Sequence, residues 1–96
     1  MFTGDAPKAL GNLAKHGLSF EEAATVFSDP DALDWEDLRH SHSERRSKRL
    51  GVSSEDRVLL VIYMVRRTKH GEETIRIISA RQASRKERKA YSGSSS

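Results

Sequence analysis

Cysteine is absent from this chain of 96 residues, which excludes disulfide bonds, thiolate nucleophiles and zinc–thiolate sites together. The chain also lacks any apolar run near the ~20 residues of a membrane span, and its first residues lack the apolar core of a signal peptide. We therefore expect a cytoplasmic protein. The histidines show no metal-binding pattern, so we expect neither a metal nor another cofactor. They are His16, His40, His42 and His70.

Charge is distributed unevenly along the chain. Residues 1–38 hold two Lys or Arg and eight Asp or Glu, whereas residues 39–96 hold fifteen and six. The two parts therefore carry −6 and +9, which favours a polyanion on the basic side and a basic partner on the acidic side. With 35% hydrophobic and 32% charged residues, we expect one folded domain over residues 1–91 and a flexible Ser/Gly tail over 92–96.

The N-terminal part predicts two helices. Asp5 is placed to cap the first, and Gly17 suits the left-handed residue that ends it. Ser19 and Glu22 form a capping box for the second helix, which stops before Pro30. Apolar residues recur at helical spacing in both segments. In the first they are Ala6, Leu10, Leu13 and Ala14, and in the second Phe20, Ala23, Ala24 and Phe27.

Strand patterns follow. Residues 58–65 are apolar on both faces, as in a central strand, and a turn at 70–72 joins them to a second strand at 73–81. Residues 33–36 alternate like a strand, and residues 45–52 form a weaker candidate because they are rich in Lys and Arg. Ser84 and Glu87 open a short C-terminal helix. The predicted fold is a small α+β domain with two N-terminal helices, an antiparallel sheet of three to four strands and a short C-terminal helix.

Arg76 lies within the strand predicted at 73–81. Alternation puts its side chain opposite those of its isoleucine neighbours, so a strand that builds the core also presents a guanidinium at a fixed position. Such an arrangement suits a phosphate, because arginine stays charged and offers two parallel donors. The alternative is that Arg76 and Arg81 are solvated or pair with Glu72 and Glu73.

Several segments together resemble one known family. In chain order they are Lys15-His16-Gly17, residues 19–30, His40-Ser41 with Glu44 and Arg46, residues 76–81, and Glu87-Arg88 with Tyr91. Over residues 5–91 they closely resemble the BrnT toxins, the ribonuclease halves of bacterial type II toxin–antitoxin pairs. The resemblance implies a RelE-like fold, an endoribonuclease activity and a BrnA-like antitoxin with a ribbon-helix-helix part. It also implies a 2:2 complex that reaches operator DNA only through the antitoxin.

The chain departs from the family pattern in two places. Family members open with an aromatic-rich strand that ends in Trp-Asp-Pro, whereas this chain has Phe2-Thr3-Gly4-Asp5-Ala6-Pro7. We therefore expect that strand to be frayed or absent. The strand after Arg46 is apolar in the family and here reads Ser47-Lys48-Arg49-Leu50, for which we expect an edge position or an altered register.

Cleavage of RNA without a metal needs a proton acceptor for the 2′-hydroxyl, cations for the phosphate and a donor for the leaving 5′-oxygen. Arg76 and Arg81 are the leading candidates for the phosphate. His40 and Glu44 are the candidates for proton transfer, because an imidazole titrates near neutrality. A histidine in a polar loop is, alternatively, an ordinary surface residue.

The remaining basic residues are candidates for substrate binding. Lys15 and His16 either contact RNA or serve the carbonyls that end the first helix. A cluster that follows Ser84 either binds phosphates or an acidic antitoxin segment, with a tyrosine stacked on a base, or is a solvated face. The cluster consists of Arg85, Lys86, Arg88 and Lys89, and the tyrosine is Tyr91. Arg46 is a separate candidate for substrate binding. The large aromatic residues Phe20, Phe27, Trp35 and Tyr63 are interpreted as core or partner interface.

The sequence and its resemblance to the BrnT toxins thus favour an endoribonuclease toxin held inactive by an antitoxin. The rival is a non-catalytic nucleic-acid-binding or corepressor module with the same basic face. A pure binder needs the arginines and the C-terminal cluster but has no use for His40 and Glu44, so these two residues separate the hypotheses.

Overall fold

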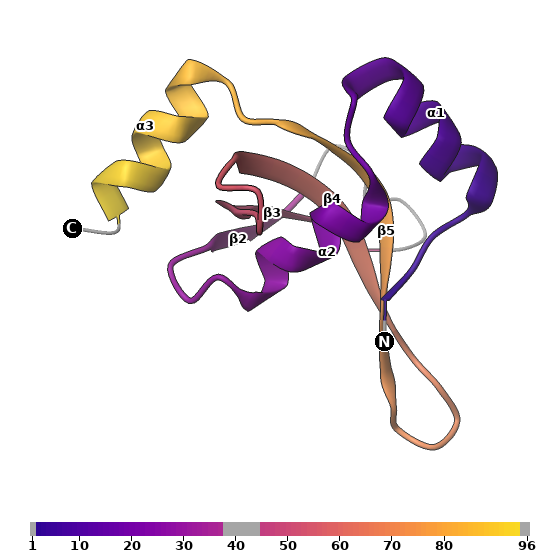
Figure 1. Cartoon of the computed structure of the whole chain (residues 1–96). Helices are drawn as coiled ribbons and strands as arrows, with labels where there is room; N and C mark the ends of the chain where they lie inside the picture. The colour runs from indigo at the N-terminus through magenta and orange to yellow at the C-terminus, as the bar shows by residue number, and fades with distance from the viewer. Residues whose placement is uncertain (1, 38–44, 95–96) are drawn as a thin grey trace.

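The computed structural model describes residues 2–37 and 45–94, and Figure 1 shows how they are arranged. The elements are β1 (Phe2–Thr3), α1 (Ala6–His16), α2 (Phe20–Thr25), the 3-10 turn η1 (Val26–Ser28), β2 (Leu33–Glu36), β3 (Ser47–Val52), β4 (Val58–Arg67), β5 (Glu73–Gln82) and α3 (Arg85–Ser94). The α+β class, both N-terminal helices and the C-terminal helix are confirmed. Residues 92–94, which were predicted to belong to a flexible tail, lie in α3, because this helix continues through Ser94.

The sheet differs from the prediction in size and in strand direction. Its five strands have the order β1-β5-β4-β3-β2. The pairs among β2, β3, β4 and β5 are antiparallel, whereas β1 runs parallel to β5, with Phe2 opposite Ile75 and Thr3 opposite Arg76. The sheet is therefore mixed. The prediction of three to four antiparallel strands missed the fifth strand, β1, which lies at the edge and runs parallel to β5.

The first strand forms although the family's tryptophan is missing. The ring of Phe2 packs against that of Phe27, with 5.1 Å between the centroids. Gly4 lies so close to Phe20 that an added Cβ would stand 2.6 Å from that ring, which only glycine allows. Aromatic packing from outside the strand therefore holds β1 against β5, so the expectation that it is frayed or absent was wrong.

The polar strand β3 is internal, between β2 and β4, and not an edge strand as expected. Arg49 explains how an internal strand tolerates a charge. Its Nε donates to the carbonyl of Val26 at 2.9 Å, and its Nη2 donates to the carbonyl of Asp29 at 3.0 Å. The guanidinium also pairs with Asp34 and lies over the ring of Phe27. With every side of the cation satisfied, Arg49 fastens β3 to η1.

Two apolar clusters lie on opposite faces of the sheet. The larger packs α1 and α2 against β4 and β5, as Figure 1 shows. The smaller lies on the other face, where α3 begins. The first cluster contains Leu18, Phe20, Ala23, Val26, Leu59, Val61, Ile77 and Ala80. The second contains Leu50, Leu60 and Ala83, with Leu33, Val58 and Tyr91 packed against them. No helix in the described residues is long and apolar enough to span a membrane.

The face that α1 buries is not the predicted one. Leu10 and Leu13 of the apolar stripe are 69% and 48% exposed, whereas Asn12 is buried. The Asn12 side chain donates to the carbonyl of Leu18 at 3.1 Å and accepts from the backbone N–H of Ala80 at 2.9 Å. A polar bridge between α1 and β5 therefore decides which face turns inward, because a buried N–H must find an acceptor.

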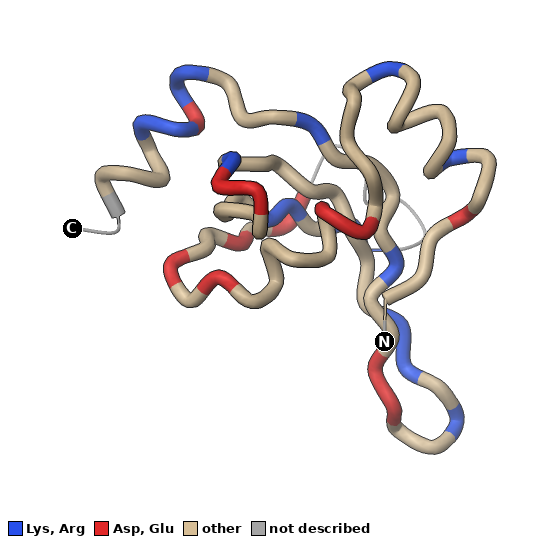
Figure 2. The backbone as a smooth tube through the Cα atoms, viewed as in Figure 1, with Lys and Arg blue, Asp and Glu red and all other residues tan. Residues whose placement is uncertain are grey.

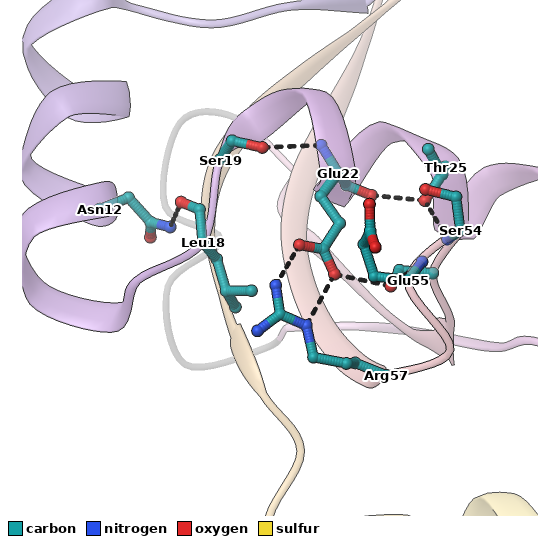
Figure 3. Close-up of polar contacts among 9 residues, drawn as sticks. Asn12, Leu18, Ser19, Glu22, Thr25, Ser54, Glu55 and Arg57 are labelled. Atoms are coloured by element: carbon teal, nitrogen blue, oxygen red, sulfur yellow. Dashed lines mark hydrogen bonds and ion pairs between the residues drawn. The ribbon is translucent and has the colours of Figure 1, made fainter.

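The end of α1 and the start of α2 have the caps that the sequence predicted. Gly17 adopts φ 68° and donates to the carbonyl of Leu13, as a left-handed helix-ending residue does. The Ser19 hydroxyl accepts from the N–H of Glu22 at 3.0 Å. The Glu22 carboxylate binds Arg57 and Ser53, and Figure 3 shows how its ion pair with Arg57 ties α2 to the β3–β4 turn. The Arg57 guanidinium lowers the pKa of Glu22 below its usual value.

Substitution of Asn12 tests the bridge between α1 and β5. Asn12→Ala leaves a buried N–H and a buried carbonyl without their partner, so we expect the free energy of unfolding to fall by about 2–4 kcal/mol. Urea unfolding followed by circular dichroism measures this loss. Gly11→Ala on the exposed side is the control and should raise stability by up to ~1 kcal/mol. Equal effects of the two substitutions would show that Asn12 acts only through helix propensity.

Candidate RNA-binding face

A bulge in β5 sets the direction of its arginines. Tyr63 pairs with Ile77 and Ile62 pairs with Ser79, so Ile78 is an extra residue in β5. Arg76 and Arg81 are an odd number of residues apart and would face opposite ways on a regular strand. The bulge corrects the phase. Arg76 pairs with Met64 and Arg81 with Leu60, and both arginines therefore lie on the sheet face away from α1 and α2, which we call the open face.

Arg76 differs from five other described arginines in having no carboxylate partner. Its side chain is half-buried and makes no hydrogen bond or ion pair with another described residue. Described ion pairs instead engage Arg45 with Glu36, Arg49 with Asp34, Arg57 with Glu22, Arg67 with Glu73 and Arg81 with Glu87. Figure 2 shows acidic residues around α2 and the segment after it, and also in the β4–β5 hairpin, where Glu73 is already paired with Arg67. The Arg76 guanidinium is therefore available to an anion.

Arg81 is held by the first turn of α3. Its Nη1 and Nη2 donate to the two Glu87 oxygens at 2.7 and 2.9 Å. Glu87 also accepts from the N–H of Ser84 at 2.8 Å, and the Ser84 hydroxyl accepts from the N–H of Glu87 at 3.1 Å. The predicted capping box is therefore complete, and Glu87 unites it with Arg81. The alternative pairing with Glu72 or Glu73 is wrong for Arg81, since its partner is Glu87.

Tyr91 anchors α3 to the rest of the domain. Its ring packs against the second apolar cluster, and its hydroxyl donates to Asp29 at 2.6 Å, which raises the pKa of Tyr91 to about 12. Burial alone would raise the pKa of Asp29, yet hydrogen bonds from Tyr91 and from the N–H of Val52 keep it below its usual value. The prediction that Tyr91 stacks on a base does not fit a ring packed in this way.

The basic side chains of α3 point away from the domain. Arg85, Arg88 and Lys89 are all exposed, and Figure 2 shows them as a run of basic residues along α3, interrupted by Glu87. Arg46 lies just before β3, where its carbonyl accepts from the N–H of Asp37 at 2.8 Å. The three residues of α3 therefore add exposed positive charge at the C-terminal end of the domain.

Two residues of the open face were not among the predicted site residues. Trp35 pairs with Lys48, and Lys48 pairs with Ile62, so both share the face that carries Arg76. Trp35 is 42% exposed, so its interpretation as core is wrong, whereas the alternative of a partner interface stays a prediction. The Lys48 side chain makes no ion pair with another described residue. The sequence signal for these two residues was the alternation of residues 33–36, which pairs with that of residues 47–50. Phe20 and Tyr63 do belong to the core, as predicted.

Lys15 and His16 lie elsewhere. They end α1, which packs on the helix-covered face, so the structure does not bring them to the open face. His40 and Glu44 lie outside the described residues. Among the described residues there is no group of three or more side chains able to hold a metal ion.

Comparison with known proteins gives a consistent assignment. Residues 5–87 match the family described as the ribonuclease toxin BrnT of type II toxin–antitoxin systems. The crystal structure of the Brucella abortus ribonuclease toxin BrnT is similar, with 25% sequence identity and a TM-score of 0.61, over 88% of this chain and 99% of that one. No curated protein matches the chain.

The Arg81–Glu87 pair predicts a pH dependence of stability. The hydrogen bond from Arg81 lowers the pKa of Glu87 from 4.5 to about 2, so the pair stabilises the fold above about pH 4.5. This contribution is lost as the pH falls toward 2. We expect Glu87→Gln to lower the free energy of unfolding at pH 7 by about 1–2 kcal/mol, a value reduced for solvent screening.

Urea titrations of wild type and Glu87→Gln between pH 7 and pH 2 measure this contribution. The difference in unfolding free energy should shrink below about pH 4.5. Glu73→Gln, which breaks the exposed pair with Arg67, is the control and should cost less than ~0.5 kcal/mol. A difference that stays constant across this range would contradict the assigned ion pair.

Proposed function

This chain belongs to the BrnT family of ribonuclease toxins of type II toxin–antitoxin systems, and from that premise we propose that it cleaves RNA on the open face without a metal. The observation that carries the proposal is Arg76, a half-buried guanidinium that shares no ion pair with another described residue. Its backbone is fixed between β1 and β4, so its position changes little when RNA binds.

The proposed reaction is an internal transfer. A base removes the proton of a 2′-hydroxyl, and the 2′-oxygen attacks the adjacent phosphorus while the bond to the 5′-oxygen breaks. The products are a 2′,3′-cyclic phosphate and a 5′-hydroxyl, the latter protonated by an acid. Negative charge increases on the phosphate oxygens as the transition state forms. Arg76 would stabilise this charge with two parallel donors.

Arg81 fits a supporting position on the same face. Glu87 occupies one edge of its guanidinium, which leaves Nε and one N–H of Nη2 to donate elsewhere. The ion pair also fixes the orientation of this guanidinium, so little side-chain entropy remains to be lost when a phosphate binds. Arg81 would therefore bind a phosphate through its remaining donors, with Glu87 as the positioning residue.

Neighbours on the open face would bind the rest of the substrate. Trp35 offers an exposed aromatic surface on which an unpaired base can stack, and Lys48 beside it offers a charge to a phosphate. The exposed cations of α3 would add electrostatic attraction. These roles supplement the residues predicted from sequence, namely Arg46, Arg85, Arg88 and Lys89.

Proton transfer remains assigned by resemblance. His40 would act as the titrating group and Glu44 as its partner carboxylate, since the family pattern contains both. The proposal places the protein in the cytoplasm, held inactive there by a BrnA-like antitoxin in a 2:2 complex that reaches operator DNA only through the antitoxin. An antitoxin segment with acidic residues over Arg76 would exclude RNA from the same cation.

Substitution of Arg76 tests the phosphate contact. A cation that touches the reacting phosphate contributes most in the transition state, so Arg76→Ala should lower kcat by about 100-fold or more while RNA affinity changes less. Cleavage of a fluorescent RNA in EDTA measures the rate. Arg67→Ala, which removes an arginine of the same hairpin already paired with Glu73, is the matched control and should stay near the wild-type rate. Full activity of Arg76→Ala at saturating RNA would remove Arg76 from the site.

The pH–rate profile tests His40. If its imidazole transfers a proton, His40→Ala should remove one arm of the profile near neutrality and leave RNA binding intact. His70→Ala, in the exposed β4–β5 turn, should leave the profile unchanged. Retention of both arms in His40→Ala would favour the rival in which the chain binds nucleic acid and does not cleave it.

A further inference from the structure

A groove runs between α1 and the outer edge of β5, outside the open face. It has a volume of about 360 Å³, and its lining combines cationic, hydroxyl and apolar groups without a carboxylate. The lining residues are Lys8, Gly11, Asn12, Lys15, His16, Ile78 and Ser79. The amide of Asn12 is already occupied by Leu18 and Ala80, so the lysines and His16 are the groups that remain for a ligand.

The charges of this groove are not compensated within the described part of the chain. Lys8 and Lys15 are seven residues apart in α1, which puts them on one side of the helix about two turns apart. Neither lysine, nor His16, makes an ion pair with a described carboxylate, in contrast to the arginines that fasten β3, β4 and α3. Two ammonium groups beside a groove without a carboxylate form a site for an anion that carries charge at more than one point.

The backbone of β5 joins this groove to the reaction site. β1 pairs with β5 only at Ile75 and Arg76, so the edge beyond Arg76 is left to α1 and to the bulged residue Ile78. Ser79, which lines the groove, pairs with Ile62 of the open face. Ser79 is three residues from Arg76, or about 10 Å along a strand. A stacked nucleic-acid strand rises about 3.4 Å per nucleotide and spans that distance within about three nucleotides.

We propose that the groove between α1 and β5 is a second phosphate-binding subsite, which holds the backbone of the RNA strand that reacts at Arg76 a few nucleotides away. The proposal rests on the ribonuclease function proposed above and adds a route for the substrate around the bulged edge of β5. Lys8 and Lys15 would bind phosphates as mobile point charges, and His16 would donate a hydrogen bond. Gly11 borders the groove in open space, since an added Cβ there meets no atom within 4 Å.

Binding of a 12-nucleotide 2′-O-methyl RNA, which lacks the attacking hydroxyl, tests the subsite by fluorescence anisotropy. Lys8→Ala should weaken binding about 5-fold at 0.1 M salt and reduce the log–log salt slope by about 0.7, the effect of one lost phosphate contact on a single strand. Lys69→Ala, which removes an exposed lysine from the β4–β5 turn, is the matched control and should change neither quantity.

Substitution of Gly11 tests the groove without removing a lysine. Gly11→Glu and Gly11→Gln place side chains of similar size at an exposed position of α1, and both residues favour a helix. Gly11→Glu should weaken RNA binding several-fold more than Gly11→Gln, because only the carboxylate repels phosphates. Circular dichroism identifies any loss of folding. Equal affinities of the two variants, or a loss in Lys8→Ala no larger than in Lys69→Ala, would overturn the subsite.

Cleavage assays separate this inference from the function on which it rests. With a cleavable 12-nucleotide RNA, Lys8→Ala should raise KM and leave kcat unchanged, whereas a dinucleotide, whose single phosphate is the one that reacts, should be cleaved as by wild type. If wild type cleaves and Lys8→Ala has an unchanged KM, only the subsite is wrong. If wild type does not cleave, the proposed function is wrong whatever RNA binding shows. A Lys8→Ala variant that loses antitoxin affinity but not RNA affinity would assign the groove to the antitoxin and overturn the proposal.

Discussion

Leu59–Arg67 of β4 pairs with Glu73–Gln82 of β5, and β5 accommodates one extra residue, Ile78. Without that residue Arg76 and Arg81 would lie on opposite faces, one of them beneath the helices. With it, Ile77 and Ala80 both enter the main core while the two arginines share the open face. The same bulge borders the groove against α1. Core packing and the placement of the cations therefore depend on one irregularity, as is common for bulges near functional sites.

Some arginines of the described structure pair with carboxylates of the chain, whereas Arg76 does not. Arg49 and Arg57 hold secondary-structure elements together through carboxylates and carbonyls, and Arg81 joins β5 to α3 through Glu87. Arg76, Lys8 and Lys15 have no carboxylate partner among the described residues. A folded chain with pI ≈ 9.5 has many cations, but those left uncompensated at fixed positions are the ones that can bind an anion with specificity. They lie on either side of the β5 edge.

Local signals predicted the fold where they were sufficient. The Ser19 and Ser84 caps and the Gly17 terminus depend on a few neighbouring residues, and each was confirmed in the structure. Strand β1 was not predicted, because a strand of two residues has no periodicity of its own and depends on contacts of Phe2 and Gly4 with distant rings. The orientation of α1 was missed because the buried residue is Asn12, whose reason for burial lies in β5.

The site was predicted in part for the same reasons. Alternation placed Arg76 on the correct face, since the residues around it follow the regular strand period. The relation of Arg76 to Arg81 was not predictable, because it requires knowledge of the bulge. Tyr91 was assigned to substrate binding because the sequence alone does not reveal its actual partner, Asp29, which is 62 residues away. Trp35 and Lys48 were missed because only the pairing of β2 with β3 shows that they lie side by side on the open face. His40 and Glu44 lie outside the described residues and stay predictions.

The chemistry of cleavage is the most direct test of this account. The substrate is an oligonucleotide that contains a single ribonucleotide among 2′-deoxynucleotides, incubated with the purified chain in EDTA and analysed by mass spectrometry. We predict one cut, immediately 3′ of the ribonucleotide, with a 2′,3′-cyclic phosphate on one product and a 5′-hydroxyl on the other. Cleavage between deoxynucleotides, products with 5′-phosphate ends, or activity only after a divalent metal is restored would contradict the mechanism.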